Sequence, residues 1–258
     1  MSKMIDTENK ELMKLFEEIQ YCENIKKYYS GEITNCYKII ECQREKEESF
    51  QLPEPWNGDI INAPILIISS NPSINKEEVY PTKEWTKEKR IDFYFNRFQS
   101  EWTKDEKYIK LKNGNYRKKS EKFWTEVKGI VEEIMEKENI ILGKDIALME
   151  VVRCKSEREE GVKKAVYDCS RKFLEKTLAS NNSKIIICTG KKAKDMLKKI
   201  YKIEENKIYF ENIIMGNKKR DLLFVGHPGS NCKRKPSSLI KEGKITESDL
   251  KKIKSKLK

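Results

Sequence analysis

The chain has 258 residues, of which 37% are hydrophobic and 37% are charged, and it carries a net charge of +12. This composition suits one packed domain with extensions, and no apolar run approaches the length of a bilayer span. The first residues, "MSKMIDTENKELMKLFEEIQ", are polar and acidic rather than signal-like, so we expect a cytoplasmic protein with no membrane contact.

The spacing of apolar residues predicts an alternation of helices and strands. In chain order we expect a helix over 7–29, irregular chain over 31–60, a strand over 65–70, a helix over 119–138, a strand over 145–152, a helix over 161–180, a strand over 184–190, a helix over 191–200 and a strand over 221–229. Apolar strands that alternate with helices indicate a parallel sheet covered on both faces. The predicted fold class is therefore α/β, with three layers (α/β/α) around a central four-stranded parallel sheet.

Composition changes along the chain and suggests its organisation. Residues 1–60 are expected to form a helical arm with a cysteine pair, and 61–232 an α/β domain that contains an insertion at about 83–128. The insertion is rich in aromatic and basic side chains, which suits single-stranded nucleic acid, although a small helical core is the alternative. The segment 233–258 has 10 Lys or Arg against 3 Asp or Glu, which indicates a polyanion-binding segment or a solvated, lysine-rich surface.

Polar side chains follow three of the four predicted strands. The first strand runs into "SNPS" at 70–73, the second ends at Glu150, and the fourth ends at His227, the only histidine of the chain. In parallel α/β sheets, ligands bind outside the carboxyl ends of the strands. Because Asn71 and His227 are each followed by a proline, we expect both at one functional site, the alternative for His227 being a surface histidine in a turn.

These motifs, in this order, resemble the uracil-DNA glycosylase superfamily. Its members have a strand that ends in a water-positioning Asp, Glu or Asn beside a proline, and a later strand that ends in His-Pro-Ser, where this chain has His227-Pro228-Gly229. The middle is similar to the iron–sulfur branch of the superfamily, which reads N-V-V-K-C-R-P-P, then a helix with a cysteine, then I-V-x-L-G-x-x-A. Here the corresponding segments are "EVVRCKS", Cys169 on the next helix, and "IIICTGKKA", and the resemblance covers about residues 64–230.

The resemblance implies a DNA glycosylase of base excision repair, which hydrolyses the N-glycosidic bond of a damaged or deaminated base. DNA, single- or double-stranded, would be the partner, and Lys233, Arg234 and Lys235 would contact its phosphates. Two alternatives stay open, a non-catalytic nucleic-acid-binding member of the same fold and a nucleotide or nucleoside hydrolase. We expect a monomer.

The resemblance also assigns roles at the strand ends. Asn71 would orient the attacking water, since an amide cannot ionise and act as a general base. A neutral His227 would donate a hydrogen bond to the base oxygen on which negative charge develops. The neighbours Ser70, Pro72 and Ser73 would form a rigid turn that contacts the substrate.

Two further residues are candidates for contact with the base. Tyr80 would stack on the flipped base, or it is an ordinary half-buried tyrosine. Glu150 replaces the uracil-reading Asn of the superfamily. If ionised it only accepts hydrogen bonds and would repel the uracil 4-oxo group, whereas if buried and protonated it could donate. Alternatively, Glu150 points elsewhere and pairs with Arg153 or a lysine.

Four cysteines resemble the ligand set of a 4Fe–4S cluster, the cofactor of the iron–sulfur branch. They are Cys36, Cys42, Cys154 and Cys169, with Cys22 as a possible replacement in the N-terminal pair. Four thiolates also bind zinc, and buried cysteines often serve only in packing, so these two alternatives remain.

Overall fold

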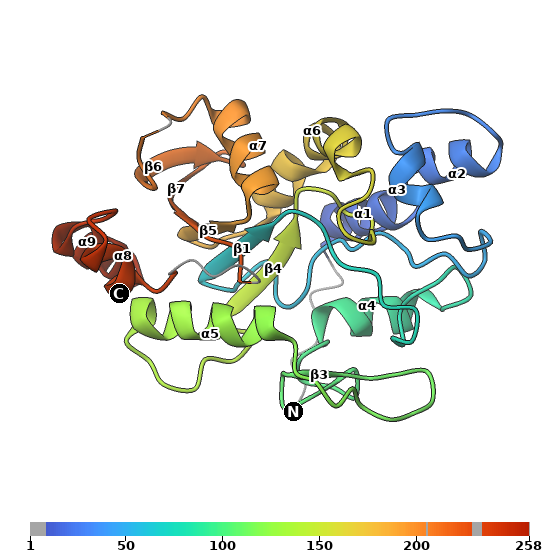
Figure 1. Ribbon diagram of the computed structural model, residues 1–258, viewed down its shortest axis with the longest axis horizontal. Helices are drawn as coiled ribbons and strands as arrows, with labels where there is room; N and C mark the ends of the chain where they lie inside the picture. The colour runs from blue at the N-terminus through green and yellow to red at the C-terminus, as the bar shows by residue number, and fades with distance from the viewer. Residues whose placement is uncertain (1–8, 205, 229–233, 258) are drawn as a thin grey trace.

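The computed structural model describes residues 9–204, 206–228 and 234–257 (Figure 1). Within these ranges the centre of the molecule is a five-stranded sheet of order β4-β1-β5-β7-β6. The strands are β1 (Ile65–Ser69), β4 (Ile146–Glu150), β5 (Ile185–Thr189), β6 (Tyr209–Met215) and β7 (Lys218–Val225). Strands β4, β1, β5 and β7 run parallel, which confirms the predicted central parallel sheet. The fifth strand, β6, pairs antiparallel with β7 and was not predicted, because its middle residues are polar or partly exposed.

The parallel strands separate two hydrophobic cores. In β1, Leu66 and Ile68 pack on one side of the sheet, and Ile65 and Ile67 pack on the other. Strands β1, β4 and β5 are buried along their whole length, as expected of a sheet covered on both faces. Their β-branched side chains favour the extended backbone and fill both cores.

Helices cover both faces of the sheet (Figure 1). One core contains residues of α1 (Lys10–Gln20), α4 (Lys87–Phe95), α6 (Val162–Ser180) and α7 (Lys191–Tyr201). The other contains residues of α5 (Lys122–Met135), α8 (Pro236–Lys241) and α9 (Glu247–Ser255). The three-layer α/β/α arrangement is therefore present. None of the described helices is long and apolar enough to span a bilayer.

The helix predicted over 7–29 is divided in two. It consists of α1 and α2 (Glu23–Tyr29), and the chain bends at Cys22, whose backbone is extended. A third short helix, α3 (Tyr37–Glu41), follows in the segment that was predicted to be irregular. The bend places Cys22 at the start of α2, close to α6.

The aromatic side chains of the insertion pack inward. The insertion contains α4, then a short hairpin of β2 (Thr103–Lys104) and β3 (Tyr108–Ile109). Most of its large aromatic side chains are buried, namely Phe93, Tyr94, Phe95, Phe98, Trp102 and Trp124. These rings therefore contribute to the cores, and they are not exposed for stacking on single-stranded bases.

The basic C-terminal segment is folded. Its helices α8 and α9 pack on α5, and Leu239, Ile245 and Ile253 enter the same core as α5. Ile253 is fully buried. This segment therefore has a structural role in addition to its positive charge.

Candidate active site

A cleft of about 720 Å³ opens at the carboxyl edge of the sheet. Asn71, Pro72 and Ser73 line it from the end of β1, Glu150 from the end of β4, and His227 from the segment after β7. Residues of the insertion and α5 complete its wall, among them Arg97, Phe123 and Trp124. The volume lies within the range of about 300–1,000 Å³ that is typical of small-molecule sites, so the cleft can hold one nucleotide.

The strand register brings these residues together. Ser69 of β1 is paired with Glu150 of β4 at the last position of both strands. Gly190, directly after β5, has a φ of +90°, and a Cβ there would be 3.0 Å from Oγ of Ser70 and 3.5 Å from Cδ2 of His227. Ser70 is buried at this junction. Gly190 thus lies in contact with the ends of β1 and β7, and its positive φ is a backbone conformation that favours glycine.

The side chain of Asn71 is held in one orientation. Its Nδ2 donates to the carbonyl oxygen of Pro72 (2.9 Å) and to Oγ of Ser156 (2.8 Å). The Pro72 carbonyl can only accept, so the amide nitrogen must face it. Within the described part of the chain, Oδ1 of Asn71 accepts no hydrogen bond. This oxygen can therefore accept a hydrogen bond from a water molecule in the cleft.

His227 follows β7 at the mouth of the cleft. Partial burial of the imidazole lowers its pKa, nearby Glu159 opposes this shift, and Arg234 adds to it. The ring is therefore neutral near pH 7 and can donate one N–H. The ring of Phe123, which also lines the cleft, lies 5.8 Å from the imidazole between centroids.

The basic residues after His227 differ in their surroundings. Arg234 is buried, and it donates from Nε to the carbonyl oxygen of His227 (2.9 Å) and from Nη1 to Glu126 (3.0 Å). Arg234 therefore holds the backbone of His227 in place. Because its guanidinium is buried and bonded to these two groups, it is poorly placed to contact a DNA phosphate. Lys235 is exposed and lies 3.8 Å from Glu133. Lys233 lies outside the described residues.

Tyr80 lies beneath the cleft rather than on its surface. It is buried, its hydroxyl donates to Oε2 of Glu54 (2.8 Å), and the ammonium of Lys155 lies 3.6 Å from its ring centroid. The ammonium of Lys155 therefore occupies a face of the ring on which a base would otherwise stack. Phe123 is the aromatic side chain that lines the cleft beside His227.

Buried charged residues form the inner end of the cleft. Arg97 pairs with both Glu54 (3.2 Å) and Glu78, and Lys155 pairs with Glu78 (2.8 Å). Burial alone would raise the pKa of Glu78, but Lys155 and Arg97 hold it below its ordinary value. Asn57 donates to Oε1 of Glu54 (2.5 Å) and accepts from Arg97 (3.1 Å). These contacts form one continuous network that fixes the shape of the cleft.

Glu150 lies beside this network. It is 7% exposed, and its Oε1 accepts a hydrogen bond from Oγ of Ser69 (3.2 Å). Burial, and next the repulsion by Glu54, raise the pKa of Glu150 well above its ordinary value. Of the two states that the sequence left open, this environment favours the protonated acid. Glu150 does not form the alternative ion pair with Arg153, whose guanidinium donates to Pro55 and Thr177.

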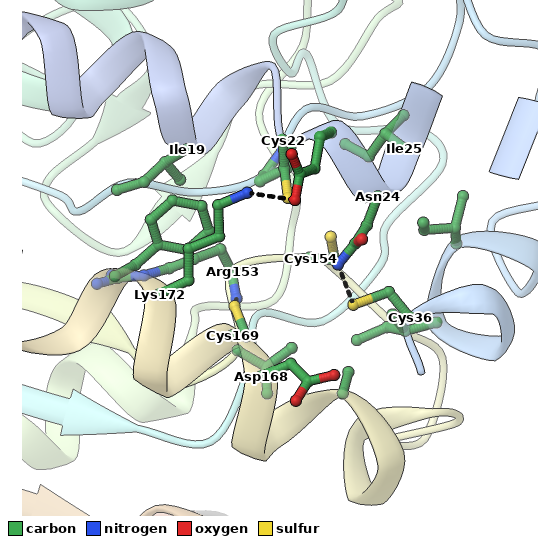
Figure 2. Close-up of a pocket in the computed structure, with 17 residues that line it drawn as sticks. Ile19, Cys22, Asn24, Ile25, Cys36, Arg153, Cys154, Asp168, Cys169 and Lys172 are labelled. Atoms are coloured by element: carbon green, nitrogen blue, oxygen red, sulfur yellow. Dashed lines mark hydrogen bonds and ion pairs between the residues drawn. The ribbon is translucent and has the colours of Figure 1, made fainter. Parts of the chain in front are cut away.

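A second cavity, of about 230 Å³, lies between the N-terminal helices and α6 (Figure 2). Four cysteines line it, namely Cys22, Cys36, Cys154 and Cys169. Figure 2 shows them around a common space, with Asn24 donating to Sγ of Cys36 (3.2 Å). The main-chain N–H of Arg153 donates to Sγ of Cys169 (3.4 Å). Hydrogen bonds of this kind tune cysteine ligands of iron–sulfur clusters, so the donor set fits such a cofactor.

Cys42 does not line this cavity. It follows α3, whereas Cys36 precedes it, so the two side chains leave opposite ends of the helix, and the thiol of Cys42 donates to the carbonyl oxygen of Ile39 (3.1 Å). Cys22, considered above as a replacement, takes its place. In the described ranges, no group of three or more His, Cys, Asp or Glu side chains is arranged to hold a metal ion. This finding applies to zinc and to an iron–sulfur cluster alike.

Several site residues were not found from the sequence. Glu54, Arg97 and Lys155 reach the cleft from three separate segments, and Ser156 contacts Asn71 across the sheet edge. Phe123 follows a polar loop at the start of α5, and it had no signal except its aromatic type. Lys155 and Ser156 belong to "RCKS", which follows β4. Their position just after a strand end was the only feature of the sequence that could have marked them as site residues.

Comparison with known proteins agrees with this geometry. The sequence model of the Uracil DNA glycosylase superfamily matches residues 55–247, which includes the whole sheet and both polar-proline strand ends. No curated protein matches the chain. Because the match extends over well more than half of the sequence, the chain belongs to the uracil DNA glycosylase superfamily.

Proposed function

We propose that this protein is a DNA glycosylase that hydrolyses the N-glycosidic bond of a damaged or deaminated base. The observation that carries the proposal is that one nucleotide-sized cleft contains both the amide oxygen of Asn71, which accepts no hydrogen bond from the residues that the structure describes, and the neutral imidazole of His227. Membership of the superfamily supports glycosylase activity in general and DNA as the partner. The excess of 54 basic over 42 acidic residues is consistent with a polyanionic substrate.

The reaction separates charge, and the two residues act on its two ends. As the glycosidic bond breaks, positive charge develops on the sugar and negative charge on the departing base. Oδ1 of Asn71 accepts a hydrogen bond from a water and directs its oxygen toward C1′ of the sugar. The N–H of His227 donates to the base oxygen on which charge accumulates. The nucleotide reaches the cleft after it leaves the base stack.

Asn71 contributes by orientation rather than by proton abstraction. An amide has no accessible protonation step near neutral pH, so the proton of the water leaves to solvent after attack. Correct placement of the water is then the main contribution, and misplacement by about 1 Å costs on the order of 100-fold in rate. Ser156 and the Pro72 carbonyl supply this placement.

A screen for base release tests the proposal. Oligonucleotides that carry uracil, hypoxanthine, xanthine or an alkylated base, single- and double-stranded, are incubated with the protein, and free base and abasic sites are measured. Release of at least one base supports the glycosylase. DNA binding without any release favours the non-catalytic alternative, and base release from free nucleosides or nucleotides, with none from DNA, favours the small-molecule hydrolase.

We further propose that Cys22, Cys36, Cys154 and Cys169 bind a 4Fe–4S cluster. Its support is that these cysteines line one cavity and that two of their sulfurs accept N–H hydrogen bonds. A 4Fe–4S cluster takes one thiolate at each of its four iron atoms, so its four ligands line a cavity that holds the whole cluster. The cluster would fasten the N-terminal helices to β4 and α6, at a distance from the reacting atoms.

A further inference from the structure

The turn that carries Asn71 is anchored near both of its ends by two adjacent residues. It runs from Asn71 to Glu78 after β1, and we call it the 71–78 turn. Ser156 contacts its first half, and Lys155 contacts its last residue. Because Lys155 and Ser156 are neighbours in the segment after β4, one short piece of chain holds the whole turn closed.

The contacts at the first half of the turn are made by Ser156. Its hydroxyl accepts from Nδ2 of Asn71 (2.8 Å), and its main-chain N–H donates to the carbonyl oxygen of Pro72 (3.0 Å). Its own carbonyl oxygen accepts from the N–H of Ile74 (3.2 Å), and Ser73 is paired with it in a parallel β-bridge. These bonds attach the backbone on both sides of Pro72 to a single residue.

The contact at the far end of the turn is a buried ion pair. The ammonium of Lys155 donates to Oε2 of Glu78 (2.8 Å), and the two side chains are 3% and 6% exposed. The same ammonium lies 3.6 Å from the ring centroid of Tyr80. A pair buried to this extent is little screened by salt, and separating its charges inside the protein is costly. The pair therefore resists movement of the turn away from the segment after β4.

Arg97 of the insertion keeps Glu78 in its charged form. Its guanidinium pairs with Glu78 as well as with Glu54 (3.2 Å). Burial would raise the pKa of Glu78, but Lys155 and Arg97 hold it below its ordinary value. The carboxylate is thus present at neutral pH, and it keeps Arg97 as a partner if Lys155 alone is replaced.

We propose that Lys155 is a positioning residue: through its ion pair with Glu78 it holds the 71–78 turn against Ser156, and so keeps the amide of Asn71 in its place in the cleft. Lys155 acts through Ser156 and Asn71, and not on the substrate. Because Arg97 supports Glu78, the insertion also contributes to this orientation. The catalytic part of the inference rests on the proposed glycosylase function.

One substitution removes the ion pair with little other change. Lys155→Met lacks the ammonium but keeps a flexible side chain of similar length. Glu78 stays paired with Arg97, so no buried carboxylate is left without a cation. The matched control is Lys128→Met, which removes the ammonium of another lysine–glutamate pair, that with Glu106 (2.9 Å). This second pair joins α5 to the β2–β3 hairpin and does not involve the 71–78 turn.

Hydrogen exchange tests the anchoring without any activity measurement. The main-chain N–H groups of Ser156 and Ile74 are protected by the bonds that attach the turn, so they exchange when the turn opens. In Lys155→Met both should exchange at least about tenfold faster than in the wild type, while the amides of β5, the middle strand of the sheet, change much less. Lys128→Met should leave both amides as in the wild type. Unchanged exchange at Ser156 and Ile74 in Lys155→Met, or an equal increase throughout the sheet, overturns the proposal.

Base release tests whether the anchoring acts through Asn71. Lys155→Met should lower kcat at least about fivefold with KM little changed, since the water is less well placed. Lys155→Arg restores a cation and should recover part of the loss. In the Asn71→Ala background, Lys155→Met should have no further effect, because the amide that it helps to place is already absent.

The kinetic outcomes separate positioning from other roles. An equal loss of rate with and without Asn71 would mean that Lys155 only stabilises the fold, and a rise in KM alone would mean that it binds the substrate. Either result overturns the proposal. If the wild type releases no base from any oligonucleotide, the proposed function fails and the catalytic role with it, while hydrogen exchange still decides whether Lys155 anchors the turn.

Discussion

Asn71 donates from Nδ2 to the hydroxyl of Ser156 at 2.8 Å, although 85 positions separate them in sequence. The main-chain N–H of Ser156 also donates to the carbonyl of Pro72 (3.0 Å), so the segment after β4 supports the turn after β1 twice. The orientation of the Asn71 side chain is therefore set in part by a residue that follows the neighbouring strand β4.

Loss of the Ser156 hydroxyl should impair catalysis more than binding. In Ser156→Ala the amide nitrogen of Asn71 keeps only its hydrogen bond to the Pro72 carbonyl. We therefore expect kcat for base release to fall roughly tenfold and KM to change little. This loss is smaller than the loss of about 100-fold that a displacement of the water by about 1 Å would cause. Ser156→Thr keeps a hydroxyl and should recover part of the rate, and Ser180→Ala at the end of α6 serves as the control. A rise in KM with unchanged kcat would show that Ser156 contributes to binding instead.

The single histidine allows a direct test of its charge state. Because burial lowers the pKa of His227, its NMR titration should give a value below about 6.5, the ordinary value. Glu159 raises this pKa and Arg234 lowers it, so Glu159→Gln should shift the titration down. Between the lowered pKa of His227 in the folded state and its ordinary pKa of about 6.5 in the unfolded state, the folded protein binds fewer protons than the unfolded one. The contribution of His227 to the free energy of unfolding therefore falls as the pH drops below about 6.5. An upward shift in Glu159→Gln would contradict the proposed surroundings.

Two buried cysteines on the N-terminal arm should differ in their effect on iron content. Cys22→Ser removes one of the four cavity-lining thiols, whereas Cys42→Ser changes a thiol outside the cavity that donates to Ile39. We expect protein purified without oxygen to contain iron and sulfide, with a sharp loss in Cys22→Ser and near wild-type content in Cys42→Ser. Absence of iron from the wild type, or equal loss in both variants, would rule out this ligand set.

The C-terminal helices should contribute to stability as well as to charge. Ile253 on α9 is fully buried, while Ile214 on the edge strand β6 is 64% exposed. Ile253→Ala should lower the free energy of unfolding by about 2–5 kcal/mol, and Ile214→Ala should change it by about 0.5 kcal/mol or less. Denaturant titrations of the two variants make the comparison. Similar small losses in both would mean that α9 is not an integral part of the fold, and that its positive charge is its main feature.

Sequence patterns were sufficient for the central sheet but not for the details of the site. Uniformly apolar strands and their polar ends identified β1, β4, β5 and β7, and the proline after Asn71 and after His227 marked the correct edge. Glu54 and Ser156 could not be found this way, because their roles depend on contacts between distant segments. Cys22 was considered only as a replacement for Cys42, which is closer to Cys36 in sequence, because the bend between α1 and α2 was not predicted. Tyr80 was a candidate to stack on the base, and its burial favours the alternative of a packed tyrosine.

The most direct test of the central claim is single-turnover base release in ¹⁸O-labelled water, measured for the wild type and for Asn71→Ala. If Asn71 directs a water to the sugar, the label should appear at C1′ of the abasic product and not in the released base. Asn71→Ala should then lose at least about 100-fold in rate while it binds the same DNA as tightly as the wild type. Failure of the wild type to release any base, or an Asn71→Ala variant as fast as the wild type, would contradict the account.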